Sequence, residues 1–292
     1  MIEIIVNPIA GKGKSMQNLA KAESIFRARG VEYNVHKTEK LGHATEIAKE
    51  LTSKGEEVLL AVFGGDGTFN EVLNGIADFE KTTVGFVPSG TGNDYVRASD
   101  IPTDPEKAVE RILAGKTGYT DFIQMQGRRC LNVAGGGMDT DTLVKYEQIK
   151  ILKGKAKYYA ALLAVLCKCK FHKVRISIDG GAPAEKSVFM IGIANGIYIG
   201  GGMPISPHSV LNDGKLNVVI VNEIKKRKVL PLLLKFLKGG KHIEESCVEE
   251  YLCDSVKLEM LDECRVQADG EILEEQTVDC HVVHETLRTF IA

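Results

Sequence analysis

The chain has 292 residues, of which 44% are hydrophobic and 26% charged, as expected of a globular protein with one large or two ordinary domains. Proteins that bind nucleic acids usually have a basic surface and aromatic side chains that stack on bases. The formal net charge of −2 and the lack of Trp therefore argue against a nucleic-acid partner. The seven cysteines include no Cys-x-x-Cys pair, so zinc-type and thioredoxin-type spacings are absent. Free buried thiols in a reducing cytosol are therefore expected.

The first predicted strand, residues 2–6, leads into a loop that suits an anion. The apolar start has no basic leader or cleavage site, so we expect a strand of a cytoplasmic protein rather than a signal peptide. Residues 7–15, NPIAGKGKS, cannot form regular structure because they contain a proline and two glycines. The lysines favour phosphate, but the spacing is not that of a Walker A loop and a plain surface turn stays open.

Strands and helices then alternate. Apolar residues at helical spacing predict helices over 16–29, 44–53 and 104–116. Short apolar runs predict strands over 31–36, 58–63, 82–87 and 119–125. This alternation is the pattern of a doubly wound parallel sheet.

The most informative stretch is residues 58–75, VLLAVFGGDGTFNEVLNG, in which a buried strand turns through glycines into a helix. Such a turn lets the main chain and the helix N-terminus approach a phosphate, and Thr68 is expected to cap the helix. A carboxylate beside a phosphate usually accompanies a metal ion, which makes Asp66 notable. An ordinary tight turn is the alternative for an isolated glycine pair.

A second glycine-rich turn, residues 88–94 with the sequence PSGTGND, follows the next predicted strand. Ligands of doubly wound sheets bind beyond the carboxyl ends of the strands. We therefore expect this turn, the turn at 64–67 and the loop at 7–15 to converge on one crevice. Asp66, Asp94 and Asp121 each follow or end a predicted strand, and oxygen ligands of this kind suit a catalytic Mg²⁺.

Beyond residue 125 the pattern changes to successive strands, which predicts a second, mostly antiparallel domain. Two helices interrupt it, over 138–170 with a break near Gly154 and over 225–238. The predicted domains are 1–125 and 126–292, with the last residues returning to the first domain. The predicted strands of the second domain are 128–134, 173–179, 187–195, 215–222, 255–261, 263–268 and 277–284.

Five motifs occur in order along the chain and carry a family resemblance. They are Asn7-Pro8 with Gly11, the 64–71 block GGDGTFNE, the 88–94 turn, NDGKL at 212–216 and Asp269-Gly270-Glu271. Together they resemble the catalytic region of the diacylglycerol kinase and sphingosine kinase superfamily, and bacterial lipid kinases of this length in particular. The 64–68 block alone is shared with NAD kinases and 6-phosphofructokinases, whereas the ordered set is specific.

The resemblance implies an α/β fold, with an N-terminal Rossmann-like domain, a C-terminal mostly antiparallel β-sandwich and the active site between them. It also implies an ATP- and Mg²⁺-dependent lipid kinase of phospholipid metabolism, which transfers the γ-phosphoryl group to the hydroxyl of diacylglycerol or a related lipid. An NAD-kinase-like phosphotransferase acting on a soluble substrate and a non-catalytic nucleotide- or lipid-binding homologue are the alternatives. No residue chooses among the lipids.

The resemblance also assigns residues to roles. The proton acceptor matches Glu271, with Asp269 and Asp66 open as alternatives. A structural Mg²⁺ matches Asp213 together with the carbonyl groups of Val210 and Lys215. The ATP contacts fall on Asn7, Pro8, Ile9, Ala10, Gly11, Thr38, Gly64, Gly65, Asp66, Gly67, Thr68, Asn70, Glu71, Thr91 and Asn93.

Two stretches, 150–173 and 225–241, place lysines around apolar runs, as a helix lying on an anionic membrane surface would. We therefore expect peripheral membrane contact with the lipid substrate there; core helices with a basic edge are the alternative, and a homodimer stays open. The seven histidines show no metal-ligand or triad spacing, so none is assigned chemistry. The basic residues are Lys150, Lys153, Lys155, Lys157, Lys168, Lys170 and Lys173, then Lys225, Lys226, Arg227, Lys228, Lys235, Lys238 and Lys241.

Overall fold

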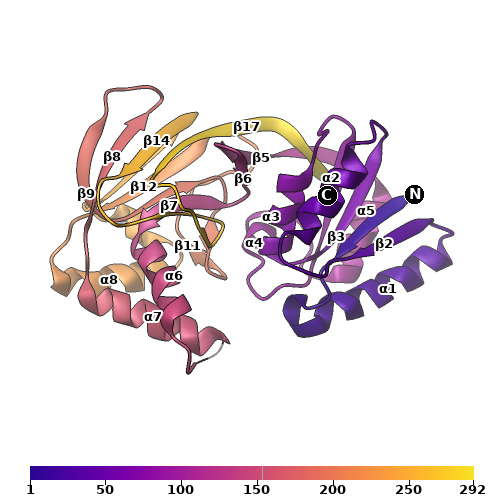
Figure 1. Cartoon of the computed structure of the whole chain (residues 1–292), viewed down its shortest axis with the longest axis horizontal. Coiled ribbons are helices and arrows are strands. Elements are labelled where there is room, and N and C mark those ends of the chain that lie inside the picture. Colours follow the sequence, from indigo (N-terminus) through magenta and orange to yellow (C-terminus); the bar gives the residue numbers. More distant parts are fainter. Residues whose placement is uncertain (153) are drawn as a thin grey trace.

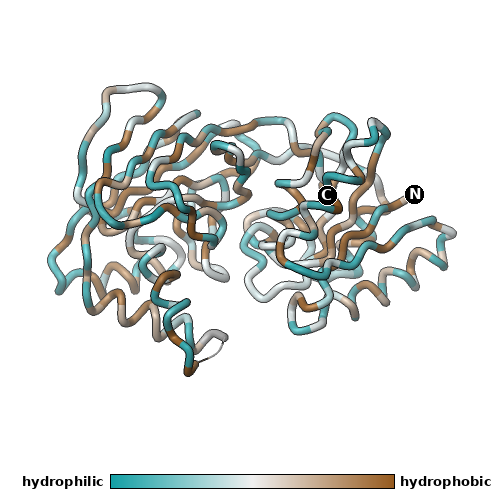
Figure 2. Tube along the Cα trace, viewed as in Figure 1, coloured by the Kyte–Doolittle hydropathy of each residue, from teal (hydrophilic) through white to brown (hydrophobic). Residues whose placement is uncertain are grey.

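The computed structural model describes residues 1–152 and 154–292, with the backbone alone at 154 and 155, and Lys153 lies outside the described residues. It has two lobes that stand side by side, and hydrophobic residues concentrate along the strands inside each of them (Figures 1 and 2). No helix of the described chain is long and apolar enough to cross a membrane.

The first lobe is a parallel sheet in the order β4-β3-β1-β2. Its strands are β1 (Ile2–Val6), β2 (Tyr33–Lys37), β3 (Val58–Gly64) and β4 (Thr82–Pro88), and their one-to-one registers carry no irregularity. Its helices are α1 (Lys14–Ala28), α2 (His43–Thr52), α3 (Asp66–Gly75), the short α4 (Asp94–Ala98) and α5 (Pro105–Ala114), with a single 3₁₀ turn η1 (Ala10–Gly13) before α1.

Both faces of this sheet are covered, because successive side chains of a strand point to opposite sides. Ile5 packs with α2 and α3 on one face, and Ile4 packs with α1 and α5 on the other. The two-sided burial explains why β1, β3 and β4 are continuous apolar runs rather than alternating ones. The structure confirms the predicted α/β architecture of this lobe.

The second lobe is mostly antiparallel and is built around one large apolar cluster. Helices α6 (Met138–Gln148), α7 (Gly154–Lys168) and α8 (Lys226–Leu237) lie together below its strands, over a second apolar cluster (Figure 1). The other elements are β5 (Thr117–Met125), β6 (Arg128–Cys130), β7 (Val133–Gly137), β8 (His172–Ile178), β9 (Ala184–Ala194), β10 (Tyr198–Ile199), β11 (Met203–Pro204), β12 (Leu216–Asn222), η2 (Lys241–Glu244), β13 (Val248–Cys253), β14 (Ser255–Met260), β15 (Val266–Ala268) and β16 (Glu271–Ile272).

The last strand, β17 (Thr277–Phe290), connects the two lobes. It pairs antiparallel with β14 at its start, antiparallel with β5 along its length and parallel with β4 through Arg288 and Thr289. A single sheet therefore runs through both lobes and fixes how they face each other.

Two predicted elements are divided in the structure. The predicted strand at 128–134 is interrupted at Leu131 and Asn132, whose backbone N–H groups donate to the Asp269 carboxylate instead of continuing one ladder. The predicted helix at 138–170 is divided into α6 and α7 near the expected break. All seven cysteines are free, as expected, but Cys167 is exposed and Cys247 is only partly buried.

Candidate active site

Three loops at the carboxyl ends of β1, β3 and β4 meet, as the strand order predicts. The Asn7 side chain donates to the Thr68 hydroxyl at 3.2 Å, which joins the first loop to the start of α3. Gly11 has φ = 58°, and a Cβ there would lie 1.9 Å from the Ser89 carbonyl oxygen. Gly65 and Gly90 face each other so closely that a Cβ on Gly65 would lie 2.9 Å from the Gly90 Cα. Glycine at these positions is therefore required for the loops to pack.

Helix α3 begins at Asp66 with Gly65 as its N-cap residue, and no side chain caps it. The predicted cap by Thr68 is wrong, because the residue lies inside the first turn and its hydroxyl accepts from Asn7 instead. Backbone N–H groups at a helix start lack intrahelical partners and favour an anion. The start of α3 is therefore open to a phosphate group.

A cavity of about 710 Å³, here called the donor cavity, lies between the lobes. The first lobe contributes Thr45, Asn70 and Glu71, and the second contributes Arg128 and Glu271. Asn70 and Glu71 are predicted ATP contacts. The Glu71 carboxylate accepts from the Ala44 backbone N–H at 3.1 Å, which fixes its position at the start of α2.

The other predicted ATP contacts lie on or near the three loops and do not line this cavity. Thr38 follows β2, and its N–H donates to the Val6 carbonyl. Thr91 and Lys12 line a separate pocket together with Tyr158 of the second lobe. Asn93 adopts φ = 52° before α4 and donates to the Gly90 carbonyl, so it shapes the second glycine turn. Ile9 is largely exposed.

A second cavity of about 230 Å³, here called the acceptor pocket, is lined by Asp66. It is lined by four acidic side chains, and three oxygens at its wall are buried without any recorded partner: Asp94 Oδ1, Asn132 Oδ1 and Asp139 Oδ1. Buried acceptors without partners are costly, so a ligand that donates hydrogen bonds, or a cation, is expected here. The four acidic residues are Asp66, Asp94, Asp139 and Asp269.

Asp66 and Asp94 lie together at the edge of this pocket. Asp66 Oδ1 accepts from the Tyr95 N–H at 3.1 Å, and Asp94 Oδ2 accepts from the Gly201 N–H at 2.8 Å. Burial, and then the charge of Asp94, raises the pKa of Asp66 to about 6, and burial also raises the pKa of Asp94. No described Lys or Arg forms an ion pair with either residue, so the two carboxylates fit Mg²⁺.

The Asp269-Gly270-Glu271 turn separates the two cavities. Asp269 faces the acceptor pocket, and its carboxylate accepts from the N–H groups of Leu131, Asn132 and Val133 at 2.6, 2.9 and 3.2 Å. Glu271 faces the donor cavity, is about half exposed and forms an ion pair with Arg128. Asp269 is therefore fixed by its backbone contacts, whereas Glu271 can move.

Asp121 lies apart from Asp66 and Asp94. Its buried carboxylate accepts from the Gly214 N–H at 2.8 Å and contacts His284 Nδ1 at 2.8 Å. It therefore lies beside the Asp213 turn, where Asp213 Oδ1 accepts from the Lys215 N–H at 3.0 Å. The predicted grouping of Asp121 with the other two carboxylates does not match this arrangement. Asp121 and Asp213 offer two carboxylates, which still suit a hard cation.

Sequence reasoning missed Asn132, Asp139, Tyr158 and Gln267, all of which line the acceptor pocket. Asp139 had a usable signal, since it follows the glycines of β7 at the start of α6, just as Asp66 follows β3. Burial raises its pKa to about 6, and Gln267 donates to its Oδ2 at 3.1 Å. The others come from separate elements without a motif.

Comparison with known proteins gives a consistent result over the whole chain. Residues 2–125 match the family described as diacylglycerol kinase catalytic domain, and residues 132–291 match the family described as YegS C-terminal NAD kinase beta sandwich-like domain. A diacylglycerol kinase of Bacillus subtilis (strain 168) is 31% identical over 92% of this chain and 88% of its own length. One of Staphylococcus carnosus (strain TM300) is 33% identical over 92% of this chain and 87% of its own.

Solved structures show the same fold. A diacylglycerol kinase from Bacillus anthracis str. Sterne superposes with a TM-score of 0.74 at 24% identity, covering 100% of this chain and 96% of its own. A yeast NADH kinase complexed with NADH superposes with a TM-score of 0.51 at 9% identity, covering 100% of this chain and 84% of its own. The likeness to the NADH kinase concerns the fold alone.

Proposed function

The chain belongs to the diacylglycerol kinase family, and we propose that it transfers the γ-phosphoryl group of ATP to the hydroxyl of diacylglycerol or a related lipid. The observation that carries this proposal is a pair of cavities on the two sides of the 269–271 turn, the smaller of which is lined by Asp66. One is large enough for a nucleotide, and the other presents buried acceptors to a hydroxyl group.

Phosphoryl transfer requires positioning and charge neutralisation more than covalent chemistry. The glycine turns at 64–67 and 88–94 and the start of α3 would supply backbone N–H groups for the phosphates, and Lys12 lines a pocket with Thr91 of the second turn. The base and ribose then extend into the donor cavity along Asn70 and Glu71. In this proposal the transferred phosphoryl group lies next to Asp66.

Asp66 and Asp94 would hold the Mg²⁺ that accompanies ATP, and this ion neutralises charge on the phosphates when bound. Asp94 supports this assignment, because its Oδ1 is buried and has no recorded partner. Asp213 would hold a second, structural cation with the carbonyl groups of Val210 and Lys215. Asp121 adjoins that turn through Gly214.

Glu271 is the proton acceptor in this proposal. Asp66 is committed to the cation, and Asp269 is committed to three backbone N–H groups. Glu271 is left with one partner, Arg128, and a side chain that is about half exposed. A swing of this side chain past Gly270, which lines the acceptor pocket, brings the carboxylate toward the attacking hydroxyl.

The acceptor pocket yields a prediction of its own. Asp139→Asn should raise KM for the lipid at least ~10-fold, because a hydrogen bond to a charged group contributes about 1.5–3 kcal/mol. KM for ATP should stay within about twofold, since Asp139 does not line the donor cavity. Steady-state kinetics in mixed micelles would measure both constants.

Glu147→Gln is the matched control for that variant, because Glu147 is exposed on the same helix. It should leave both constants unchanged. A change in KM for ATP with an unchanged KM for the lipid would show that Asp139 has been assigned to the wrong substrate.

The identity of the lipid is tested by labelled ATP against a panel of lipid alcohols. The panel contains a diacylglycerol, a monoacylglycerol and a long-chain base, each in the same micelles, and the products are separated by thin-layer chromatography. We expect the diacylglycerol to be the preferred acceptor by kcat/KM. Preference for the long-chain base would indicate sphingosine kinase activity instead.

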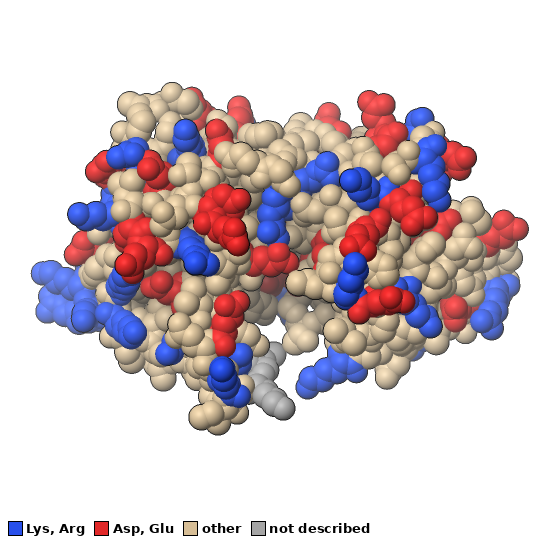
Figure 3. Space-filling view, viewed as in Figure 1, with Lys and Arg blue, Asp and Glu red and all other residues tan. Residues whose placement is uncertain are grey.

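We also propose that the chain meets its lipid at an anionic membrane surface. Leu230, Leu234 and Leu237 form an exposed apolar row on α8, and Leu163 is exposed on α7. Val229, Leu232 and Phe236 on the other side of α8 are buried in the lobe, so the helix is anchored while its outer row is free. Figure 3 shows basic side chains gathered at the left edge of the molecule, where α8 lies in Figure 1.

Charge reversal at Lys225, Lys226 and Lys228 should weaken binding to anionic vesicles at least ~100-fold, since each near-surface charge contributes about 1 kcal/mol. Higher salt should weaken binding of the unmodified chain in the same direction. Co-sedimentation with phosphatidylglycerol vesicles measures both effects. The corresponding prediction for 150–173 rests partly on Lys153, which lies outside the described residues.

The control carries the same charge change on the first lobe, at the exposed Lys49, Lys54 and Lys107. It should bind vesicles nearly as well as the unmodified chain. Equal loss in both triple variants would mean that net charge, rather than α8, determines the binding.

A further inference from the structure

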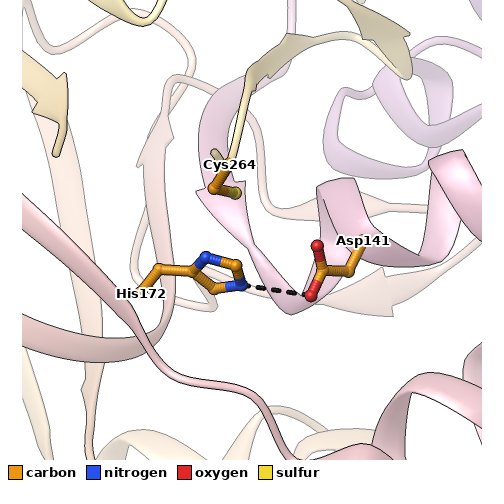
Figure 4. Close-up of side chains that lie close together, drawn as sticks. All are labelled: Asp141, His172 and Cys264. Atoms are coloured by element: carbon orange, nitrogen blue, oxygen red, sulfur yellow. Dashed lines mark hydrogen bonds and ion pairs between the residues drawn. The ribbon is translucent and has the colours of Figure 1, made fainter. Parts of the chain in front are cut away.

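Outside both cavities, a buried histidine lies close to two other side chains that can bind a metal. The His172 side chain is fully buried at the start of β8, and Figure 4 shows Asp141 of α6 and Cys264 converging on it. His172 Nε2 lies 3.1 Å from Asp141 Oδ2. One ligand atom from each of the three residues lies within 4.8 Å of the other two.

Asp262 orients this group from behind. Its two carboxylate oxygens lie 3.2 and 3.1 Å from His172 Nδ1, so that nitrogen carries the proton and Nε2 faces Asp141. The same carboxylate accepts from the N–H groups of Lys173 and Cys264 at 3.2 and 2.9 Å. It therefore positions the two segments that carry His172 and Cys264, as the outer carboxylate of many zinc sites does.

Spacing and charge both favour a divalent cation. Two ligands that each lie about 2.0 Å from a tetrahedral zinc ion are about 3.3 Å apart, close to the observed separation of Nε2 and Oδ2. Among the described residues, neither Asp141 nor Asp262 forms an ion pair with Lys or Arg. Two carboxylates and a thiol thus share a single imidazole as their cationic partner.

We propose that Asp141, His172 and Cys264 bind one Zn²⁺ ion as a structural site separate from the catalytic centre. Imidazole and thiolate ligands select zinc over Mg²⁺, which prefers oxygen ligands. The three side chains leave a fourth position for water. The site is distinct from the Asp213 turn, whose proposed ligands are oxygen atoms.

The proposed zinc site adjoins the acceptor pocket through Asp141 and Cys264. Asp141 lies two residues beyond Asp139 on α6, and Cys264 lies three residues before Gln267, which donates to Asp139 at 3.1 Å. A bound ion would therefore hold α6 against the β14–β15 connection and stabilise the wall of that pocket. The sequence offers no signal for this, since the ligands are 31 and 92 residues apart.

A proton competes with the ion for His172. Zinc must displace this proton and that of the Cys264 thiol, so binding should release protons and weaken as the pH falls.

Cobalt(II) titration of the full chain, stripped of metal with a chelator, tests the proposal. We expect one equivalent of Co²⁺ to produce the intense visible bands of a tetrahedral site and a sulfur-to-cobalt charge-transfer band, and Zn²⁺ to abolish them. The charge-transfer band separates this site from oxygen sites such as Asp66 or Asp213.

Variants identify the ligands. Cys264→Ser should remove the charge-transfer band, whereas Cys167→Ser, at an exposed thiol on α7, should retain it. Asp262→Asn should keep the band and weaken the affinity by ~10–100-fold, the usual effect of losing an outer partner. Circular dichroism of each variant confirms that it is folded.

The proposal is overturned if Co²⁺ gives only weak octahedral bands, or if the charge-transfer band survives in folded Cys264→Ser. Proton release gives an independent readout, because calorimetry in buffers of different ionisation enthalpy should show it on zinc binding. No proton release, together with no charge-transfer band, would mean that His172 only forms hydrogen bonds with the two carboxylates.

Discussion

Asp66→Asn should reduce phosphoryl transfer by at least ~100-fold, the scale of losing one positioned charge at a reaction centre. The amide keeps the size of the side chain and can still accept from the Tyr95 N–H. What it loses is the negative charge that lies beside Asp94 at the edge of the acceptor pocket. Initial rates with saturating ATP and diacylglycerol, over a range of Mg²⁺ concentrations, would measure the loss.

Asp279→Asn is the matched control, because Asp279 is exposed on β17 and its carboxylate has no recorded contact with a described residue. It should keep full activity. Equal activity of the two variants, with both folded, would remove Asp66 from the active site.

The same substitution should have the opposite effect on stability in the absence of metal. Because the pKa of Asp66 is raised, ionising this carboxyl group is less favourable in the folded state than in the unfolded state. This destabilisation is absent at a pH below the ordinary pKa of 3.8 and is complete at a pH above the folded-state pKa of about 6. Removing the carboxyl should therefore stabilise the fold above pH about 7, by on the order of 2 kcal/mol, and have little effect near pH about 3. Thermal unfolding in the presence of a chelator would measure the stability change at both pH values. A loss of stability in Asp66→Asn above pH about 7 would contradict the interpretation of Asp66 and Asp94 as a pair of repelling carboxylates that bind a metal ion.

Glu271→Gln should lower kcat by ~10²- to 10⁴-fold, which is the usual contribution of a proton acceptor. ATP affinity, measured by calorimetry, should change less than about threefold, because the glutamine keeps the size of the side chain at the cavity wall. A variant that loses ATP affinity and keeps kcat would show that Glu271 binds the nucleotide and accepts no proton.

Asp269→Asn is the informative comparison for this variant. Its carboxylate accepts from three backbone N–H groups, so an amide at this position should reduce stability by about 1–3 kcal/mol. Normal turnover in Glu271→Gln, with activity lost in a folded Asp269→Asn, would exchange the roles of the two residues.

The sequence was sufficient to predict the first lobe and the loops that meet there. Residues 58–75 encode a strand, a turn and a helix locally, because the apolar run, the glycines and the helical spacing are adjacent in the chain. The meeting of Gly65 with Gly90 then follows from parallel strands, whose carboxyl ends share one edge.

The acceptor pocket could not be predicted in the same way. Asn132, Asp139 and Gln267 belong to separate segments of an antiparallel lobe, and they meet only because β15 pairs with β7. Asp121 illustrates the same difficulty. It lies at the Asp213 turn, where the Gly214 N–H donates to its carboxylate. The two residues are 93 positions apart in the sequence.

The central claim, that this chain phosphorylates a lipid, is tested most directly by offering labelled ATP together with two acceptors in one reaction. Diacylglycerol in mixed micelles and NAD in solution represent the two functions that share the 64–68 block. We expect label in phosphatidic acid, none in NADP, and loss of that product in Asp66→Asn but not in Asp279→Asn. Label in NADP with none in lipid would contradict the account and identify a phosphotransferase for a soluble substrate.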